Sequence, residues 1–233
     1  MRNFELKVKK QWNEVYVNDN FTKKPQRNLP QIANFFKLNN ISRILDLGCG
    51  SGRNIVYLAK EGFEMYGLDI SSEGVHKTKL WLKKEGVNAS LKVRSMYGKL
   101  PYQKNYFDAI MCIRTLNHGT IQDIRKAISE IKRILKPNGF IYLTVVKGIT
   151  KSLQKDYTFI DSRTYVPLGG REKGVIHYLF NKNILEKEFK DFKIIKLSTN
   201  KSLKNKDEYY VLFGKLNHKP NLNSRTNNNK YNS

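Results

Sequence analysis

The sequence has few of the residues that build disulfide frameworks, metal clusters or membrane spans. Its 233 residues include only two cysteines, Cys49 and Cys112, whose spacing matches no zinc or redox motif and does not indicate a disulfide framework. No apolar run reaches the roughly 18 residues of a membrane-spanning helix, and no apolar leader segment is present near Met1. We therefore expect a soluble, cytoplasmic α/β domain without a membrane partner.

Acidic residues are also scarce. The chain has 20 Asp and Glu residues against 43 Lys and Arg residues, which gives a net charge of +23. Such an excess suits a nucleic-acid or anionic-membrane partner. However, the lysines are spread along every expected helix, and Lys, Asn and Ile are frequent throughout the chain. A general compositional bias therefore explains the charge better than a dedicated nucleic-acid groove, although RNA remains an alternative partner.

The complete phosphate-binding glycine motifs are missing from the most informative stretch, Ile44–Asn54 (ILDLGCGSGRN). The apolar run Ile44–Leu47 predicts a buried strand and Asn54–Lys60 predicts a helix, so the three alternating glycines occupy the turn between them. Glycine there lets the backbone approach a ligand closely. A dinucleotide turn has a third glycine where this chain has Arg53, and no Gly-Lys-Ser/Thr follows. The sequence therefore argues against a dinucleotide and excludes a triphosphate loop.

The segments DLGCGSGRN and GLDIS (Gly67–Ser71) resemble the first two motifs of class I S-adenosylmethionine-dependent methyltransferases. Asp46 lies two residues before the first glycine, and Asp69 ends the next predicted strand. The alternative is an ordinary strand-turn-helix in another doubly wound protein. The resemblance implies an α/β, Rossmann-like doubly wound sheet of seven strands in the order 3-2-1-4-5-7-6. Strand 7 is then antiparallel, helices cover both faces, and an N-terminal helical lid covers the cofactor.

The expected organisation has three parts. Residues 1–40 form the N-terminal helical lid, residues 41–216 form the methyltransferase domain, and the Asn-rich residues 217–233 form a disordered polar tail. Within the domain, residues 148–177 form an insertion of about thirty residues, long enough to suggest a substrate site. The expected strands after the first are Glu64–Asp69, Ser90–Arg94, Tyr106–Ile113, Phe140–Val146, Phe192–Leu197 and Tyr209–Lys215. The expected helices include Phe4–Val17, Gln31–Leu38, Ser72–Glu85, Gln122–Leu135 and Asn183–Lys190.

The resemblance implies S-adenosyl-L-methionine as the cofactor and a set of residues around it. Asp69 is expected to accept hydrogen bonds from both ribose hydroxyls, and Ile70 to lie against the adenine. Ser95 occupies the place of a family acid and retains a hydroxyl acceptor. A helix-capping role is the alternative for Asp69. The predicted cofactor residues are Asp46, Gly48, Cys49, Gly50, Asn54, Asp69, Ile70, Ser95, Met96 and Ile113.

The methyl acceptor is expected beside the segment after the fourth strand, at the same edge of the sheet as the glycine turn. His118 is the predicted catalytic residue, which orients or deprotonates the acceptor. The insertion pattern Gly170-x-Glu172-x-Gly174-x-x-His177-x-x-Phe180 resembles one in small-molecule methyltransferases of the tellurite-resistance type. The predicted substrate-binding residues are Tyr16, Asn117, Arg171 and His177. The alternatives are that the histidines only pack, and that Trp12 and Tyr16 only anchor a helix.

Three functions compete. The first is methyl transfer to a small-molecule acceptor by in-line displacement. The second is methylation of tRNA or rRNA, which only the charge favours, and the missing Asn/Asp-Pro-Pro-aromatic motif counts against methylation of base amino groups. The third is a cofactor-binding protein without catalysis. No cluster of carboxylates and histidines has the spacing of metal ligands, so no metal is expected. The expected assembly is a monomer or homodimer.

Overall fold

The computed structural model describes residues 3–18, 23–148, 156–201 and 208–217. The predicted tail, apart from Asn217, and the first part of the predicted insertion lie outside these residues. The helices are α1 (Asn3–Asn18), α2 (Leu29–Leu38), α3 (Arg53–Lys60), α4 (Ser72–Glu85), α5 (Ile121–Ile134) and α6 (Lys182–Glu188). The strands are β1 (Arg43–Leu47), β2 (Glu64–Asp69), β3 (Ser90–Val93), β4 (Phe107–Ile113), β5 (Leu135–Gly148), β6 (Tyr157–Phe159), β7 (Thr164–Pro167), β8 (His177–Tyr178), β9 (Phe192–Lys201) and β10 (Glu208–Leu216).

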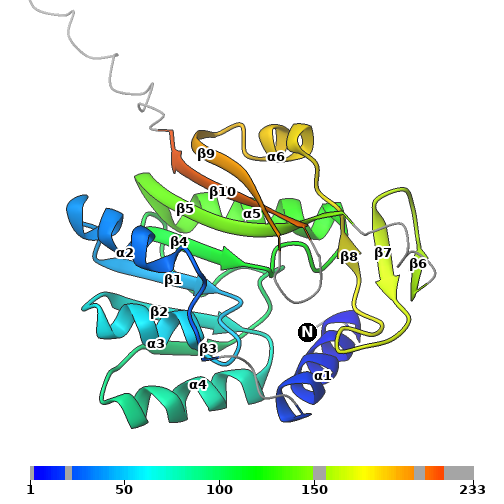
Figure 1. The fold of residues 1–233 in the computed structure, drawn as a ribbon, viewed down its shortest axis with the longest axis horizontal. Helices are drawn as coiled ribbons and strands as arrows, with labels where there is room; N and C mark the ends of the chain where they lie inside the picture. Colours follow the sequence, from blue (N-terminus) through cyan, green and yellow to red (C-terminus); the bar gives the residue numbers. More distant parts are fainter. Residues whose placement is uncertain (1–2, 19–22, 149–155, 202–207, 218–233) are drawn as a thin grey trace, which may run out of the picture.

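A seven-stranded sheet forms the centre of the molecule, in the order β3-β2-β1-β4-β5-β10-β9 (Figure 1). The first five strands along the chain pair in parallel, and β10 is antiparallel to both β5 and β9. Within this sheet β9 and β10 are the sixth and seventh strands along the chain. The predicted order 3-2-1-4-5-7-6, with an antiparallel seventh strand, is therefore confirmed. Two strands are longer than expected, since β5 already begins at Leu135 and β9 extends to Lys201.

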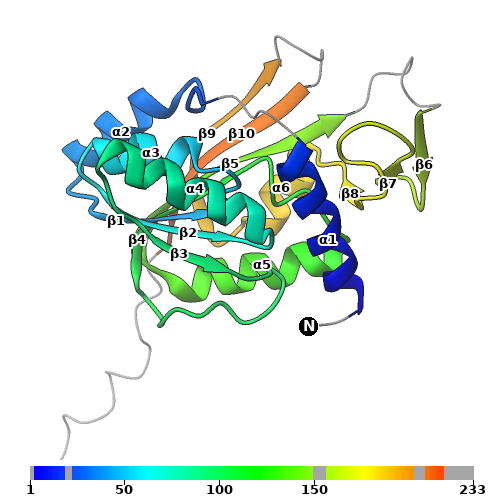
Figure 2. The same ribbon diagram turned by 90° about the horizontal axis from the view of Figure 1, so that it is seen from below.

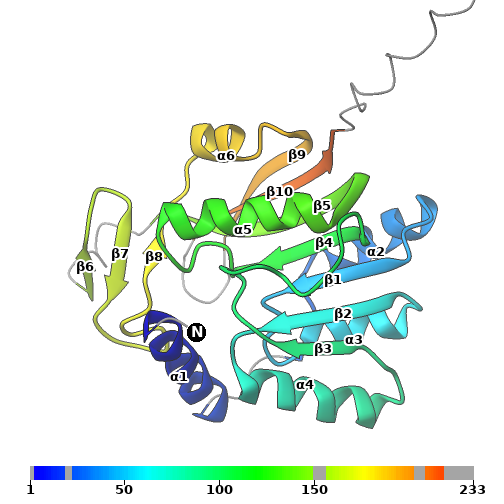
Figure 3. The same ribbon diagram turned by 180° about the vertical axis from the view of Figure 1, so that it is seen from behind.

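Helices cover both faces of this sheet because its central strands are apolar on both sides. Figure 2 shows α2, α3 and α4 on one side of the sheet and α5 on the other, and Figure 3 shows α5 in front of the strands. The helix α5 buries one apolar face against the sheet, which fits its helical spacing of apolar residues. Thr120 and Asp123 form a reciprocal capping box that fixes the start of α5. None of the described helices is long and apolar enough to cross a membrane.

The two helices of the predicted lid have different surroundings. The helix α2 packs onto the sheet, where Phe36 is fully buried and the Phe35 ring lies 5.2 Å from that of Phe140 and 5.0 Å from that of Phe213. The helix α1 instead lies beyond the carboxyl ends of the parallel strands, near β7 and β8 (Figure 1). Of the described residues before β1, therefore, those of α1 are placed to cover a ligand at that edge.

The insertion contains a second sheet, in which β6, β7 and β8 pair in the antiparallel sense. These strands have only three, four and two residues, too few to show a sequence periodicity. Main-chain hydrogen bonds join this sheet to the loop after β4: Gly119 N–H donates to Ile176 O at 2.8 Å, and Tyr178 N–H donates to Asn117 O at 2.8 Å. The insertion is thereby held over the carboxyl ends of the main sheet.

Candidate functional site

A cavity of about 1180 Å³ opens where the carboxyl ends of the parallel strands meet α1 and the insertion. It exceeds the roughly 300–1,000 Å³ that is usual for a site holding one small ligand, so it has room for a cofactor and an acceptor together. The predicted site residues that line it are Tyr16, Gly48, Cys49, Gly50, Asn54, Asp69, Ile70, Ser95, Met96, Ile113, Asn117, His118, Arg171 and His177. Asp46 does not line it.

The glycine turn packs too closely on its neighbours to accept side chains. Gly48 and Gly50 have φ angles of +83° and +55°, in the left-handed region that favours glycine. A Cβ atom on Gly48 would lie 2.2 Å from Thr115 Cγ2, and one on Gly50 would lie 2.3 Å from the Tyr16 hydroxyl oxygen. The turn therefore presents bare backbone to the cavity while it contacts both the loop after β4 and α1.

Asp69 ends β2 beside this turn and is 8% exposed. Its carboxylate accepts hydrogen bonds from Gly50 N–H and Ser71 N–H, both at 2.8 Å. Burial raises the pKa of Asp69, and the backbone N–H donors oppose that rise. The N-cap of α4 is Ser71, which accepts from Gly74 N–H at 3.0 Å, so Asp69 is not the helix cap. Each carboxylate oxygen retains acceptor capacity for a further donor.

Asp46 lies buried beneath the glycine turn, 1% exposed, rather than on the cavity wall. Among the described residues, neither of its carboxylate oxygens has a partner with full hydrogen-bond geometry, although the Asn54 side chain lies close enough to stabilise the charge. Burial raises the pKa of Asp46 to about 7, and the Arg53 guanidinium and the Asn54 side chain oppose the rise. Its predicted contact with a cofactor is thus not a direct wall contact, and an indirect role through the turn remains a prediction.

The wall expected to hold the adenine is mixed in character. Ile70 and Met96 supply apolar side chains, and Ser95 is 7% exposed. The Ser95 hydroxyl oxygen accepts a hydrogen bond from Tyr97 N–H at 3.2 Å, while its own hydrogen is free to donate elsewhere. The buried Tyr97 hydroxyl has no hydrogen-bond partner among the described residues. This wall can therefore offer both an apolar surface and polar groups to a planar ring.

The helix α1 forms another wall and contacts both halves of the site. Trp12 and Tyr16 line the cavity, and the Trp12 ring lies 5.0 Å from the His118 ring. The Asn13 side-chain oxygen accepts from the Ser71 hydroxyl at 2.8 Å, at the start of α4. The Gln11 side-chain amide donates to Lys173 O at 2.7 Å, in the insertion. The two aromatic residues thus line the cavity on a helix docked against both α4 and the insertion, and the lid function itself remains a prediction.

Two histidines meet at the acceptor end of the cavity. His118 and His177 form a main-chain bridge, and their rings lie edge to face with centroids 4.7 Å apart. Burial lowers the pKa of each imidazole to about 3, with the Arg114 charge adding to the effect at His118. Both rings are therefore neutral near pH 7. An imidazole with so low a pKa is a weak base, so of the two predicted roles of His118 this pKa suits orientation of the acceptor better than deprotonation.

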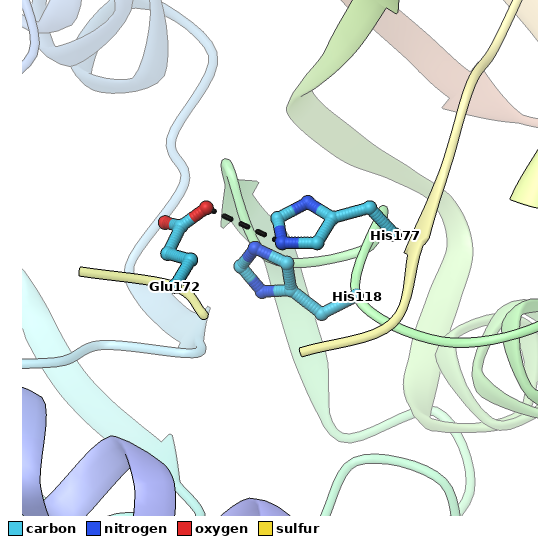
Figure 4. A group of neighbouring side chains, drawn as sticks. All are labelled: His118, Glu172 and His177. Atoms are coloured by element: carbon cyan, nitrogen blue, oxygen red, sulfur yellow. Dashed lines mark ion pairs between the residues drawn. The ribbon is translucent and has the colours of Figure 1, made fainter. Parts of the chain in front are cut away.

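Glu172 completes a cluster with the two histidines (Figure 4). Its Oε2 atom lies 3.3 Å from His177 Nε2, and the three potential ligand atoms of His118, Glu172 and His177 all lie within 4.8 Å of one another. Spacing in the sequence gives no sign of this cluster, so the expectation that no metal binds was made without it. The three residues are far apart in sequence, and the main-chain bridge between the loop after β4 and the insertion brings them together.

Sequence reasoning missed several residues of the cavity wall. Arg53 and Arg114 both line the cavity. The sequence motif marks Arg53 only as the replacement of a glycine. Glu172 is part of the insertion pattern described above, but the sequence alone assigns it no role. Arg171, a predicted substrate residue, is exposed at the rim of the cavity. The conspicuous signal for Glu172 was its position between two glycines, which places an acidic side chain on a tight loop.

Comparisons with known proteins agree with the fold. Residues 44–139 match a family model described as a methyltransferase domain. A ubiquinone biosynthesis O-methyltransferase from Rickettsia conorii is 27% identical over 139 residues, which cover 58% of this chain and 47% of that protein. The chain thus spans about half the length of this curated relative. It matches only part of that protein, so the relative's complete activity does not transfer to it.

Solved structures extend the likeness beyond the matched segment. A SAM-dependent methyltransferase from Methanosarcina mazei has a TM-score of 0.72 at 23% identity, and the alignment covers 82% of this chain and 98% of that one. A 1,6-didemethyltoxoflavin-N1-methyltransferase from Burkholderia thailandensis, solved with bound S-adenosylhomocysteine, has a TM-score of 0.66 at 13% identity, over 91% of this chain and 85% of that one. Taken with the glycine turn and Asp69, the family match identifies residues 44–139 as a methyltransferase domain of the class I S-adenosylmethionine-dependent type, and the solved structures share its fold.

Proposed function

We propose that this chain transfers the methyl group of S-adenosylmethionine to a small-molecule acceptor by in-line displacement. The observation that best supports this proposal is a single cavity with two ends. One end is lined by the glycine turn and Asp69, and the other is lined by Asn117, His118 and His177. The bound cofactor would supply a methyl group on a positively charged sulfur. An acceptor lone pair would bond to the methyl carbon as the carbon–sulfur bond breaks, in one step that releases the neutral thioether. No covalent intermediate with the protein is needed, so the chain contributes chiefly by positioning the reactants and excluding water.

The residues at the first end fit the cofactor. The carboxylate of Asp69 has acceptor capacity left for the two ribose hydroxyls. The glycine turn has no side chains of its own at Gly48 and Gly50, where a Cβ atom would clash, so its backbone can approach the amino-acid part of the cofactor. Ile70 and Met96 would hold the adenine ring between apolar side chains. Asp46 would support the turn from beneath.

The second end fits an acceptor of limited size. Trp12 walls this part of the cavity beside His118, so a small molecule suits it better than a folded RNA. Asn117 and His118 would orient the acceptor, and the Arg114 and Arg171 guanidinium groups would hold an anionic group on it. The relative from Rickettsia is named as methylating oxygen and the Burkholderia protein as methylating a ring nitrogen. Both names denote small acceptors, which supports this substrate class and leaves the accepting atom open.

The test of this proposal is incubation of the protein with methyl-labelled S-adenosylmethionine and fractionated cell extract. We expect label to enter the metabolite fraction. Label in the RNA fraction would support the RNA alternative instead. Calorimetry that showed no heat with S-adenosylmethionine but saturation with NAD or ATP would overturn the cofactor assignment.

A matched pair of glycine variants sharpens the cofactor test. Gly48→Ala is expected to abolish binding of S-adenosylmethionine, because its Cβ atom meets Thr115 and the turn must shift. Gly62→Ala is the control: its φ of +92° is similar, yet a Cβ atom there has nothing within 4 Å. The control therefore carries backbone strain alone, about 1 kcal/mol. Equal cofactor affinity in both variants would remove the glycine turn from the cofactor site.

A further inference from the structure

We propose that His118, Glu172 and His177 bind one divalent first-row transition-metal ion at the acceptor end of the cavity. Each residue offers one donor atom, and all three donor atoms lie within 4.8 Å of one another on the cavity wall. In Figure 4 the Glu172 carboxylate and the two imidazole rings lie close together, with the carboxylate directed at His177. The binding of the ion is independent of the methyl transfer proposed above; only its catalytic role rests on that function.

The backbone holds the three donors in place. The main-chain bridge between His118 and His177 is closed by the hydrogen bonds from Gly119 N–H and Tyr178 N–H described above. Two main-chain hydrogen bonds hold the loop that carries Glu172: Val175 N–H donates to Glu172 O at 3.0 Å, and Gly174 N–H donates to Pro167 O at 2.9 Å. The proximity of the ligands therefore follows from the fold and does not depend on one flexible side chain meeting another.

The spacing is close to that of a metal site. Bonds of about 2.0–2.2 Å to nitrogen and oxygen separate neighbouring ligand atoms by roughly 3–3.5 Å. The Glu172 Oε2 and His177 Nε2 atoms already lie 3.3 Å apart. The His118 ring and the Glu172 side chain are both partly exposed. Side-chain rotations that move their donor atoms by about 1 Å can therefore bring all three donors to the spacing of a metal site.

A second observation points to a ligand for His177. This side chain is 2% exposed, yet its Nε2 atom has no hydrogen-bond partner among the described residues, since the contact with Glu172 lacks hydrogen-bond geometry. Its Nδ1 atom lies 3.4 Å from the Asn117 side-chain nitrogen, and the Asn117 side-chain oxygen is also unpartnered among the described residues. With the Asn117 carboxamide turned over, its oxygen accepts from Nδ1–H. The Nε2 lone pair is then directed at the ion, as is usual for metal-bound histidine.

The donor set selects the class of ion. Two imidazoles and one carboxylate suit Zn²⁺, Fe²⁺, Mn²⁺ or Co²⁺, whereas Mg²⁺ prefers oxygen ligands alone. Three protein ligands leave at least one position open, as in catalytic sites. An acceptor hydroxyl bound there would lose its proton to water more readily, because the ion lowers its pKa. Its oxygen would then bond to the methyl carbon as the carbon–sulfur bond breaks, with no change in the oxidation state of the metal.

The first experiment is calorimetry with Zn²⁺, and separately with Mg²⁺, on the full chain made without a histidine tag and freed of metal with a chelator. We expect one Zn²⁺ per chain and no binding of Mg²⁺. Reconstitution with Co²⁺ is expected to give the visible absorption of a site with mixed nitrogen and oxygen ligands. Absence of binding by both Zn²⁺ and Co²⁺ would overturn the proposal, and His177 would then be part of a simple pair with Glu172.

Variants test which residues carry the binding. Glu172→Gln keeps the size of the side chain, and His118→Gln alters a partly exposed position. Each is expected to weaken Zn²⁺ binding by roughly tenfold or more. His76→Gln, at an exposed position on α4, is the control and is expected to bind as the unaltered chain does. Zn²⁺ affinity that is unchanged in both cluster variants would also overturn the proposal.

The two proposals fail in different ways. Zn²⁺ titration needs neither S-adenosylmethionine nor an acceptor, so it can succeed where methyl transfer fails. Calorimetry with S-adenosylmethionine on the same variants shows whether the cofactor end is intact. Thermal unfolding of each variant shows whether it is folded. Weakened Zn²⁺ binding with unchanged cofactor binding is the result expected from a local metal site.

Discussion

At the scale of single residues, Asp46 is the most unusual group of the cofactor half. A carboxylate that is buried without a hydrogen-bond partner destabilises the folded state when it is ionised. Its pKa is about 7 in the folded chain, against about 4 in an unfolded chain. Between these two values the folded state binds more protons than the unfolded state. Stability is therefore lost as the pH rises from about 4 to about 7.

We expect Asp46→Asn to stabilise the ligand-free protein. The gain is expected to be small near pH 4, to grow up to pH 7 and to stay level above it, reaching about 1–3 kcal/mol. Thermal or urea unfolding of the variant and the unaltered chain at several pH values measures it. Asp108→Asn is the control with opposite sign, because Asp108 accepts from Arg43 N–H and from Lys136 and its pKa is lowered. No gain from Asp46→Asn at pH 8 would contradict the argument.

Most of the residues predicted to hold the cofactor lie in two short motifs next to predictable strands, which is why the sequence could place them at the cavity. The residues at the acceptor end could be predicted one by one, but their contacts with one another could not. His118 follows β4 and His177 begins β8, but sequence gives no signal that the main chain pairs them. Glu172 joins them through the same tertiary contact. Asp46 differs from the other residues of its motif: it is not among the residues that line the cavity, and its role toward the cofactor remains a prediction.

At the scale of elements, α1 holds the two halves of the site together. It contacts the start of α4 through Asn13 and the insertion through Gln11. The Lys77 side chain also donates to Tyr16 O, which adds a further contact with α4. Because α1 carries Trp12 and Tyr16 along the cavity, its docking determines how well the cavity is closed.

We expect Asn13→Ala to weaken binding of S-adenosylmethionine by about five- to tenfold, the worth of roughly one hydrogen bond. The reason is that α1 loses its contacts with Ser71 and with Glu73 N–H at the start of α4. Calorimetry measures the change. Asn18→Ala, on the same helix, removes a hydrogen bond only to Glu14 O within α1 and serves as the control. Equal affinities in the two variants would mean that docking of α1 does not affect the cofactor.

The main sheet was predictable at this scale because each strand has a buried apolar run and each connecting helix has a cap or an amphipathic pattern. The small sheet β6-β7-β8 was not, because its strands are too short to show alternation. The placement of α2 was also missed. Its aromatic side chains, Phe35 and Phe36, pack on the sheet, while the sequence pattern of an amphipathic helix does not say which surface it covers.

At the scale of the whole molecule, the net charge of +23 gives a general attraction for polyanions. We expect binding to RNA to fall by at least tenfold between about 50 mM and about 200 mM salt, because released counterions drive it. We also expect two RNA strands of unrelated sequence to bind equally well. Fluorescence anisotropy with labelled strands measures both properties. A sequence preference that persists at the higher salt would favour the RNA alternative over a small-molecule acceptor.

The joint between the insertion and the loop after β4 is made by amide groups of the main chain, through Gly119, Ile176 and Tyr178. The Tyr178 donor and both carbonyl acceptors belong to the main chain, so these contacts do not depend on the side chains at those positions, whereas Gly119 has a φ of +140° that favours glycine. We therefore expect the other side chains of the insertion to be open to change while the segment still docks in the same place. Chimaeras that exchange this segment are then a direct route to new acceptors.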